Sequence, residues 1–123
     1  MNLLDSSGWL EYFVDGENAD FFAPIAQDIE NVIIPVICIY EIFKVVRREK
    51  SKSDALQAIT VLQGGKIVEI SQDIALSAAI VSRKHKLPMA DSMIYAIAKK
   101  EKATLWTQDI DFKGLNNVKY ISK

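Results

Sequence analysis

The sequence predicts an α/β fold in which helices cover both faces of a central parallel sheet, a three-layer α/β/α sandwich. Short runs of apolar and β-branched residues alternate along the chain with longer segments whose apolar residues recur at helical spacing. This alternation is typical of parallel sheets, because a crossover, usually a helix, must join each strand to the next. The 123 residues contain no linker or repeat, so we expect one domain spanning residues 1–123.

Capping and turn residues divide the first half of the chain into elements. We expect two strands here, Asn2–Ser6 and Val32–Ile34. The residues expected to start the four helices are Ser7, then Asn18 or Asp20, then Pro35, and then Ser51 or Ser53. Proline suits the first turn of a helix because its missing N–H is not needed there. We expect the helix that starts at Pro35 to reach near Lys50.

The second half of the chain repeats the alternation after a break at Gly64-Gly65. We expect strands at Lys66–Ile70, Ala103–Thr107 and Val118–Ile121. Between them, we expect helices at Asp73–Lys86 and from Pro88 to Glu101.

Charge is distributed unevenly along the chain. Residues 1–43 carry eight acidic side chains and no Lys or Arg, whereas residues 44–123 carry fifteen basic and eight acidic ones. The division indicates either a polyanion and a basic partner on different surfaces, or complementarity within the molecule. The single cysteine, Cys38, excludes an intramolecular disulfide. With no leader-like segment and no apolar run long enough for a bilayer, we expect a cytoplasmic protein without a membrane segment.

Acidic residues follow the carboxyl ends of the expected strands. Asp5 ends the first strand, and Asp109 and Asp111 follow the fourth. Glu41 lies about two turns into the helix after the second strand, and Asp91 lies in the first turn of the helix after Pro88. Ligands of open parallel sheets bind at this edge, so we expect these acids to meet there. Each acid also has a structural explanation, such as an ion pair for Glu41 or a helix-dipole role for Asp91.

A cluster of carboxylates predicts a bound cation. Two carboxylates about 4 Å apart repel by about 4 kcal/mol at an effective dielectric near 20. Oxygen ligands favour hard cations such as Mg²⁺ or Mn²⁺, and the lack of a Cys/His cluster argues against zinc. The only histidine, His85, lies in a basic run and is expected to be solvated. Acid–base chemistry would then rest on a water activated by the metal and directed at a phosphate.

Four stretches carry these acids in a recognisable order. They are Leu4-Asp5-Ser6-Ser7, Tyr40-Glu41, Leu87-Pro88-Met89-Ala90-Asp91-Ser92-Met93-Ile94 and Thr107-Gln108-Asp109-Ile110-Asp111-Phe112. Their order and spacing resemble those of PIN-domain nucleases, and most closely the VapC-type toxins of prokaryotic toxin–antitoxin operons. The resemblance covers essentially the whole chain. It implies the α/β/α sandwich and an Mg²⁺- or Mn²⁺-dependent endoribonuclease.

The resemblance also assigns roles by position. The residues that match the acidic quartet, and so are expected to bind the metal and catalyse, are Asp5, Glu41, Asp91 and Asp109. The residues that match supporting positions, two hydroxyls and a variable fifth acid, are Ser6, Thr107 and Asp111. Tyr95 stands where a small residue is usual, so we expect it to narrow the pocket or its entrance.

Members of this family usually form homodimers and are inhibited by a cognate antitoxin. The basic stretch that we expect to hold the RNA backbone comprises Lys44, Arg47 and Arg48, although a solvated helix face is the alternative. An aromatic group forms either core or a groove for an antitoxin segment. Its members are Trp9, Tyr12, Phe13, Phe21 and Phe22.

Two other functions compete with this interpretation. A catalytically silent PIN domain would bind RNA or protein without cutting. The other is a phosphatase or phospho-receiver of related architecture. A haloacid-type phosphatase requires Asp-x-Asp after its first strand, but Asp5 is followed by Ser6-Ser7, so a nucleophilic aspartate is poorly supported.

Overall fold

The structure is a computed structural model that describes residues 1–123, and it contains a five-stranded parallel sheet. The strands are β1 (Asn2–Leu4), β2 (Val32–Pro35), β3 (Lys66–Val68), β4 (Thr104–Thr107) and β5 (Val118–Tyr120). Their order in the sheet is β3-β2-β1-β4-β5, and every neighbouring pair is parallel. The first strand of the chain is therefore the centre of the sheet.

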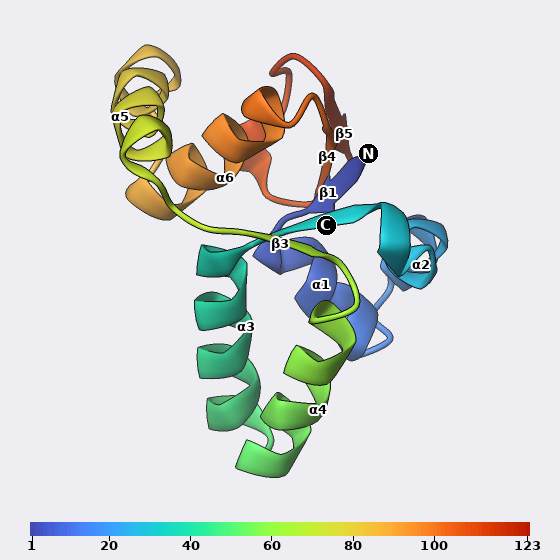
Figure 1. The fold of residues 1–123 in the computed structure, drawn as a ribbon. Coiled ribbons are helices and arrows are strands. Elements are labelled where there is room, and N and C mark those ends of the chain that lie inside the picture. Colours follow the sequence, from blue (N-terminus) through green and yellow to red (C-terminus); the bar gives the residue numbers. More distant parts are fainter.

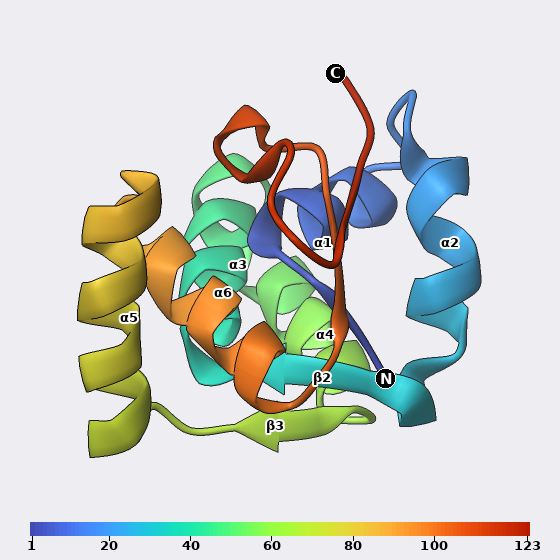
Figure 2. The ribbon, with the colours of Figure 1, turned by 90° about the horizontal axis from the view of Figure 1, so that it is seen from above.

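Six α-helices cover the sheet. They are α1 (Ser6–Phe13), α2 (Ala19–Gln27), α3 (Val36–Glu49), α4 (Lys52–Leu62), α5 (Gln72–His85) and α6 (Met89–Lys100). The chain steps from β1 to β2 to β3 in one direction and then returns to β4 beyond β1. Because parallel crossovers are right-handed, this reversal places α5 and α6 on the opposite face from α1 to α4. Figure 1 shows this division, and Figure 2 shows α5 and α2 at opposite sides of the molecule. The predicted α/β/α sandwich is confirmed.

Burial on both faces explains the mostly apolar sequences of β1 and β2. Leu3, Leu4 and all four residues of β2 are buried, because helices lie on both faces of the sheet. The edge strand β3 is mostly exposed. None of the six helices has both the length and the apolar character needed to span a membrane.

The ends of several elements differ from the sequence prediction. The strand expected to reach Ser6 ends at Leu4, and α1 begins at Ser6 rather than after a Ser7 cap. The cause is Asp5, whose carboxylate accepts a hydrogen bond from the backbone N–H of Gly8 and so caps α1. Pro35 ends β2 and caps α3 rather than lying in its first turn. The other expected elements shift by only a few residues at their ends.

Gly8 allows α1 and α2 to approach each other closely. A methyl group at Gly8 would lie 2.9 Å from a ring carbon of the buried Phe22. Overpacking costs about 1–3 kcal/mol, while alanine gains about 1 kcal/mol of helix propensity over glycine. We therefore expect Gly8→Ala to lower the free energy of unfolding, measured by urea denaturation. The same change in a Phe22→Leu background should cost less, and an unchanged or higher midpoint for Gly8→Ala alone would contradict this packing.

Candidate active site

The sheet order brings the five predicted acids to one edge of the molecule. β1 lies between β2 and β4, so the segments that follow these three strands are neighbours at their carboxyl ends. Asp5 follows β1, Asp109 and Asp111 follow β4, and Glu41 lies on α3 after β2. Asp91 is in the first turn of α6, which crosses the sheet on the other face. Residues from both helical layers therefore contribute to the same cluster.

Asp5 is the most enclosed of these acids, with only 2% of its surface exposed. Its Oδ1 accepts hydrogen bonds from the Ser7 hydroxyl at 2.8 Å and from the Gly8 N–H at 2.9 Å. Its Oδ2 accepts one hydrogen bond, at 2.7 Å, from the hydroxyl of Thr107 at the end of β4. A carboxylate oxygen offers about two lone-pair positions. Oδ2 therefore keeps one position that can accept a further ligand.

Two further hydrogen bonds fix the neighbouring acids. The Ser6 hydroxyl donates to Oε1 of Glu41 at 2.6 Å, which links the start of α1 to α3. The Asp109 N–H donates to the Thr107 hydroxyl at 2.9 Å, and that hydroxyl in turn donates to Asp5. Thr107 therefore orients the Asp5 carboxylate, which follows β1, and the backbone that carries Asp109.

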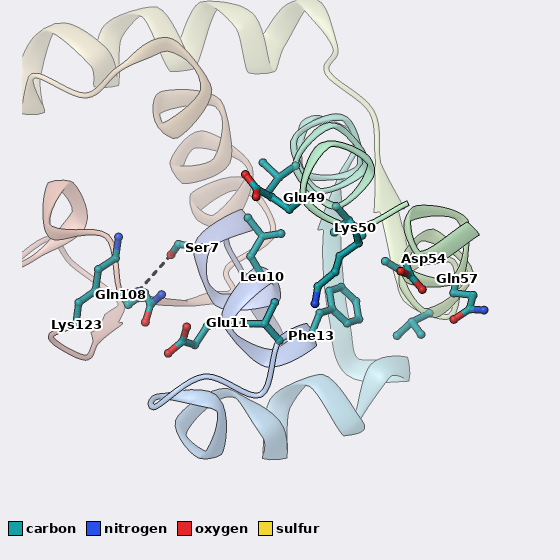
Figure 3. Close-up of a pocket in the computed structure, with 15 residues that line it drawn as sticks. Ser7, Leu10, Glu11, Phe13, Glu49, Lys50, Asp54, Gln57, Gln108 and Lys123 are labelled. Carbon is teal, nitrogen blue, oxygen red and sulfur yellow. Dashed lines mark hydrogen bonds between the residues drawn. The ribbon is translucent and has the colours of Figure 1, made fainter. Parts of the chain in front are cut away.

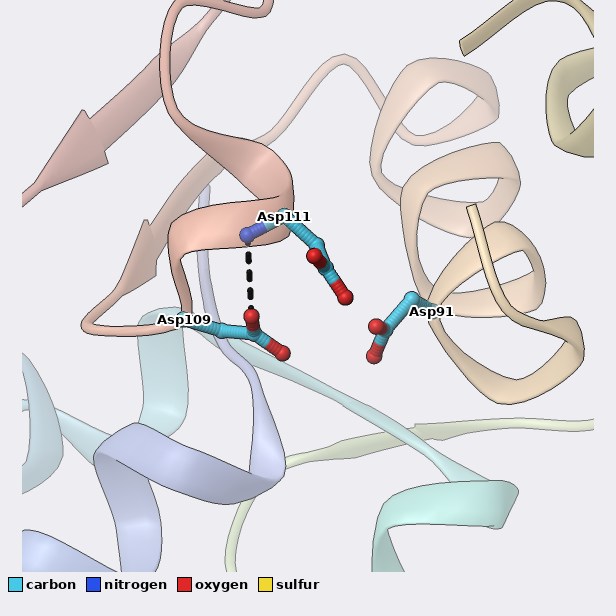
Figure 4. Close-up of side chains that lie close together, drawn as sticks. All are labelled: Asp91, Asp109 and Asp111. Carbon is cyan, nitrogen blue, oxygen red and sulfur yellow. Dashed lines mark hydrogen bonds between the residues drawn. The ribbon is translucent and has the colours of Figure 1, made fainter. Parts of the chain in front are cut away.

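The side chains of Asp91, Asp109 and Asp111 form the tightest group of acids. One carboxylate oxygen from each lies within 4.8 Å of those of the other two. Figure 4 shows the three side chains pointing toward one another, with the Asp111 N–H bonded to Asp109 Oδ1 at 2.9 Å. Asp111, which the resemblance treats as a variable supporting residue, thus lies within the same 4.8 Å of Asp91 as the quartet member Asp109.

Burial and repulsion disfavour the charged forms of two of these acids. The pKa of Asp91 is raised to about 7, mainly by burial and then by repulsion from the other four acids. No hydrogen bond from the protein offsets that increase. The pKa of Asp5 is raised to about 6 by burial, although its three hydrogen bonds partly oppose the rise. The charges of the other four acids are therefore all close enough to Asp91 to raise its pKa.

The donor atoms of this cluster fit a hard divalent cation. They are carboxylate oxygens with no sulfur or imidazole among them, which suits Mg²⁺ or Mn²⁺. A cation would also relieve the repulsion that raises the pKa of Asp91. The residues present therefore suit such an ion, and their chemistry alone does not distinguish between the two metals.

Comparison with protein families identifies the chain. A family model of the PIN domain matches residues 3–117. The chain belongs to the PIN-domain family. No protein of curated function matches it in sequence.

Solved structures with the same fold include components of toxin–antitoxin systems. One chain of a toxin–antitoxin complex from Klebsiella pneumoniae has a TM-score of 0.81 at 24% identity, covering 97% of this chain and 96% of that one. VapC20 of Mycobacterium tuberculosis, a toxin that cleaves the sarcin–ricin loop, has a TM-score of 0.74 at 12% identity, with 92% of each chain covered. VapBC2 from Rickettsia felis, bound to a DNA fragment from its promoter, has a TM-score of 0.73 at 18% identity, covering 98% of this chain and 97% of that one. At these identities the likeness establishes the fold of the PIN domain.

Some residues that hold the site of this PIN domain were not assigned a role from the sequence. Ser7 was expected only to cap a helix, yet its hydroxyl donates to Asp5. Gln108 is buried, and its side-chain oxygen accepts a hydrogen bond from Asn18 Nδ2 at 3.0 Å. The same Asn18 nitrogen donates to the Ser122 carbonyl at 3.1 Å and ties the end of the chain beside the site. For Ser7 the sequence offered one signal. A serine two residues after an aspartate that caps a helix can donate its hydroxyl to that aspartate.

The predicted RNA-binding residues of this PIN domain lie along α3 beyond Glu41. Lys44 Nζ is 5.6 Å from the centre of the Tyr40 ring. The Arg47 and Arg48 side chains are in the last turn of α3, and Arg48 Nε is 3.1 Å from Glu49 Oε1. Their role in binding RNA therefore stays a prediction.

The aromatic group of this PIN domain divides between core and surface. Trp9 and Phe22 are fully buried, whereas Tyr12, Phe13 and Phe21 are half-buried. Phe13 lines a groove of about 640 Å³ between α1, α3 and α4, drawn in Figure 3. Trp9 and Phe22 therefore belong to the core, whereas the use of the groove by an antitoxin segment stays a prediction.

The raised pKa values predict how stability of the metal-free protein depends on pH. Asp5 and Asp91 hold protons more tightly when folded than an unfolded aspartate, whose pKa is about 4. Between about pH 4 and pH 7 the folded state binds more protons, so these groups lower stability as pH rises through that window. We expect the melting temperature in EDTA to fall less steeply over this range for Asp91→Asn than for the wild type. Equal slopes would contradict the prediction.

Proposed function

We propose that this chain is a metal-dependent endoribonuclease, the toxin of a toxin–antitoxin pair. The observation that carries the proposal is the gathering of five acids around Asp91 at the carboxyl edge of the sheet, with the pKa values of Asp5 and Asp91 raised. The cluster does not help the protein to fold, because repulsion among its carboxylates opposes folding. Membership of the PIN family and the oxygen-only donor set support phosphodiester hydrolysis as its use.

In this proposal, each residue has a distinct task. Asp5, Glu41 and Asp91 hold Mg²⁺ or Mn²⁺, and Asp109 completes the site directly or through a water. Such an ion supplies an activated water and neutralises charge on the phosphate. Thr107 and Ser6 keep the Asp5 and Glu41 carboxylates in place by donating to one oxygen of each. Asp111 adds negative charge beside Asp91 and Asp109. Lys44, Arg47 and Arg48 contact the RNA backbone.

The cleavage proposal predicts that Asp91→Asn removes activity and preserves the fold. We expect RNA cleavage with Mn²⁺ to fall by at least about a hundredfold, because a ligand that stabilises the transition state is removed. Asp73→Asn is the matched control, since Asp73 occupies the first turn of α5 as Asp91 does that of α6. The measurement is the rate of cleavage of a labelled RNA, with circular dichroism to verify folding.

Two results would overturn this assignment. Full cleavage by Asp91→Asn would show that the cluster is not the active site. Wild-type protein that retards the RNA without shortening it, in the presence of Mn²⁺, would favour the catalytically silent binder.

We further propose that the groove between α1, α3 and α4 receives an amphipathic segment of the antitoxin. Its apolar lining comes from all three helices, including Leu10, Phe13, Val46 and Val61. The acidic side chains around it, Glu11, Glu49 and Asp54, outnumber the basic ones, Lys50 and Lys123. An apolar groove with acidic borders suits a helix that carries basic side chains beside its apolar face. The similar structures from toxin–antitoxin complexes support this partner class.

A pair of substitutions on one helix tests the groove. Val61 and Leu56 are both exposed residues of α4, but only Val61 lines the groove. We expect Val61→Glu to weaken binding of the protein encoded by the adjacent upstream gene by about tenfold or more, through burial of an unpaired charge. Leu56→Glu should bind like the wild type, as measured by calorimetric titration. Equal affinities for both variants would place the antitoxin elsewhere.

The family resemblance also leads us to propose a homodimer in solution. Sedimentation of the free protein tests this directly, and a monomer at micromolar concentration would contradict it.

A further inference from the structure

A second hollow, separate from the apolar groove, lies where the end of α5 meets α6 and the loop between β4 and β5. Its volume is about 250 Å³, and Lys84, His85, Tyr95, Lys99 and Asn116 contribute to its lining. Three of its lining residues, Lys84, His85 and Lys99, are basic, and no acidic residue lines it. It therefore differs in charge from both the carboxylate cluster and the groove.

The basic residues of this hollow have no acidic partner. Neither Lys84 nor Lys99 forms an ion pair, since the two ion pairs of the molecule are Arg48–Glu49 and Lys66–Glu101. Lys99 Nζ lies 6.0 Å from the centre of the Tyr95 ring. Two unpaired ammonium groups beside a hollow without acidic residues attract an anion.

The frame of the hollow is held by buried contacts. Tyr95 is only 4% exposed, and its hydroxyl donates to the Asn116 carbonyl at 3.1 Å. The His85 ring meets the Tyr95 ring edge-on, with 5.8 Å between their centres. These contacts join α5, α6 and the loop, so an anion would enter a site that is already formed. Tyr95, which the resemblance led us to expect at the entrance of the acidic pocket, belongs to this frame.

The hollow and the candidate active site share helix α6. Asp91, Tyr95 and Lys99 are spaced four residues apart and follow one stripe of α6. Each step along that stripe is about 6 Å. On the other side, the Tyr95 ring lies 6.5 Å from that of Phe112, which follows Asp111 in the chain. Tyr95 is buried between Asp91 and Lys99, so a strand bound at the carboxylates would pass over this residue to reach Lys99, about two helical turns away.

Helix electrostatics accounts for only part of this arrangement. Basic residues in the last turn of a helix stabilise its dipole, and Lys84, His85 and Lys99 all occupy such turns. That role requires neither a hollow nor the absence of acids from its lining. It also does not require Lys99 and Lys84, from different helices, to line the same hollow.

We propose that this hollow binds a backbone phosphate of the RNA, flanking the one at the carboxylate cluster. The inference rests on the proposed ribonuclease function and adds to it a place for the substrate strand. Lys84 and Lys99 neutralise the phosphate, and His85 and Asn116 border it. Contacts of this kind position a strand without reading its sequence.

His85 provides a direct probe, because it is the only histidine in the chain. Its ring protons can be followed by NMR in the Asp91→Asn protein with Mg²⁺, which prevents cleavage during the experiment. We expect a short single-stranded RNA to shift the His85 signals along a saturating curve. Sodium chloride at the same ionic strength should not produce this shift. Inorganic phosphate is titrated separately, to distinguish a site for free anions from one for the strand.

Substitution of the two lysines tests the interaction energetically. In the Asp91→Asn background, Lys84→Gln combined with Lys99→Gln should make the salt dependence of RNA binding shallower, by about 0.7 for each phosphate that the protein no longer neutralises. Lys52→Gln is the control, because Lys52 is exposed at the start of α4 and lines neither the hollow nor the groove. Fluorescence anisotropy of a labelled RNA at several salt concentrations gives the slopes.

The results that would contradict the proposed phosphate site can be told apart from one another. If RNA binds without shifting the His85 signals, the strand does not enter the hollow. The same conclusion follows if the salt dependence of RNA binding is equal for the double lysine variant and for Lys52→Gln. A response to inorganic phosphate alone makes it a site for small anions instead. If the wild type cleaves RNA in any of these cases, the ribonuclease proposal stands and only the subsite fails. An Asp91→Asn protein that binds no RNA also overturns the subsite.

Discussion

The need to keep several carboxylates close together at a buried edge of the sheet governs much of this structure. Asp5 illustrates the constraint, because it is nearly inaccessible and yet lies among other acids. The fold compensates with three hydrogen bonds to Asp5, from Ser7, Gly8 and Thr107. Asp91 has no such compensation from the protein. The site is therefore held by hydrogen bonds at Asp5 but electrostatically unsatisfied at Asp91 on α6, which is where a cation would stabilise the protein most.

Helix α1 connects this site to the apolar groove. Its first turn holds the acidic site, through the cap at Asp5 and the hydroxyls of Ser6 and Ser7. Its later turns supply Leu10 and Phe13 to the groove. One short helix thus carries both surfaces, so a partner in the groove would rest on the same element that positions Asp5. The hollow at Lys84 and Lys99 lies in the other helical layer and shares α6 with Asp91.

Patterns with a local physical cause were predictable from the sequence. The parallel sheet and its helices follow from the alternation of apolar runs and capping residues, and the edge shared by the acids follows from strand polarity. The end of β1 was misplaced because Asp5 was considered only as a strand-end acid, although it is also the cap of α1. The close approach of Asp111 to Asp91 depends on the short 3₁₀ turn Ile110–Phe112, which no propensity rule indicates. The hollow was not foreseen, since its residues come from three segments and only packing brings them together.

The hydrogen bonds of Asn18 have a practical consequence for anyone who extends this chain. Asn18 holds the Ser122 carbonyl and Gln108 together, and Lys123 lines the groove. A tag or fluorescent protein joined to Lys123 would therefore start from a residue that lines the groove and would compete there with a partner. Met1 precedes β1 at the amino end of the strands, on the edge opposite the acids. A fusion joined there would start at the edge of the sheet away from the acidic site.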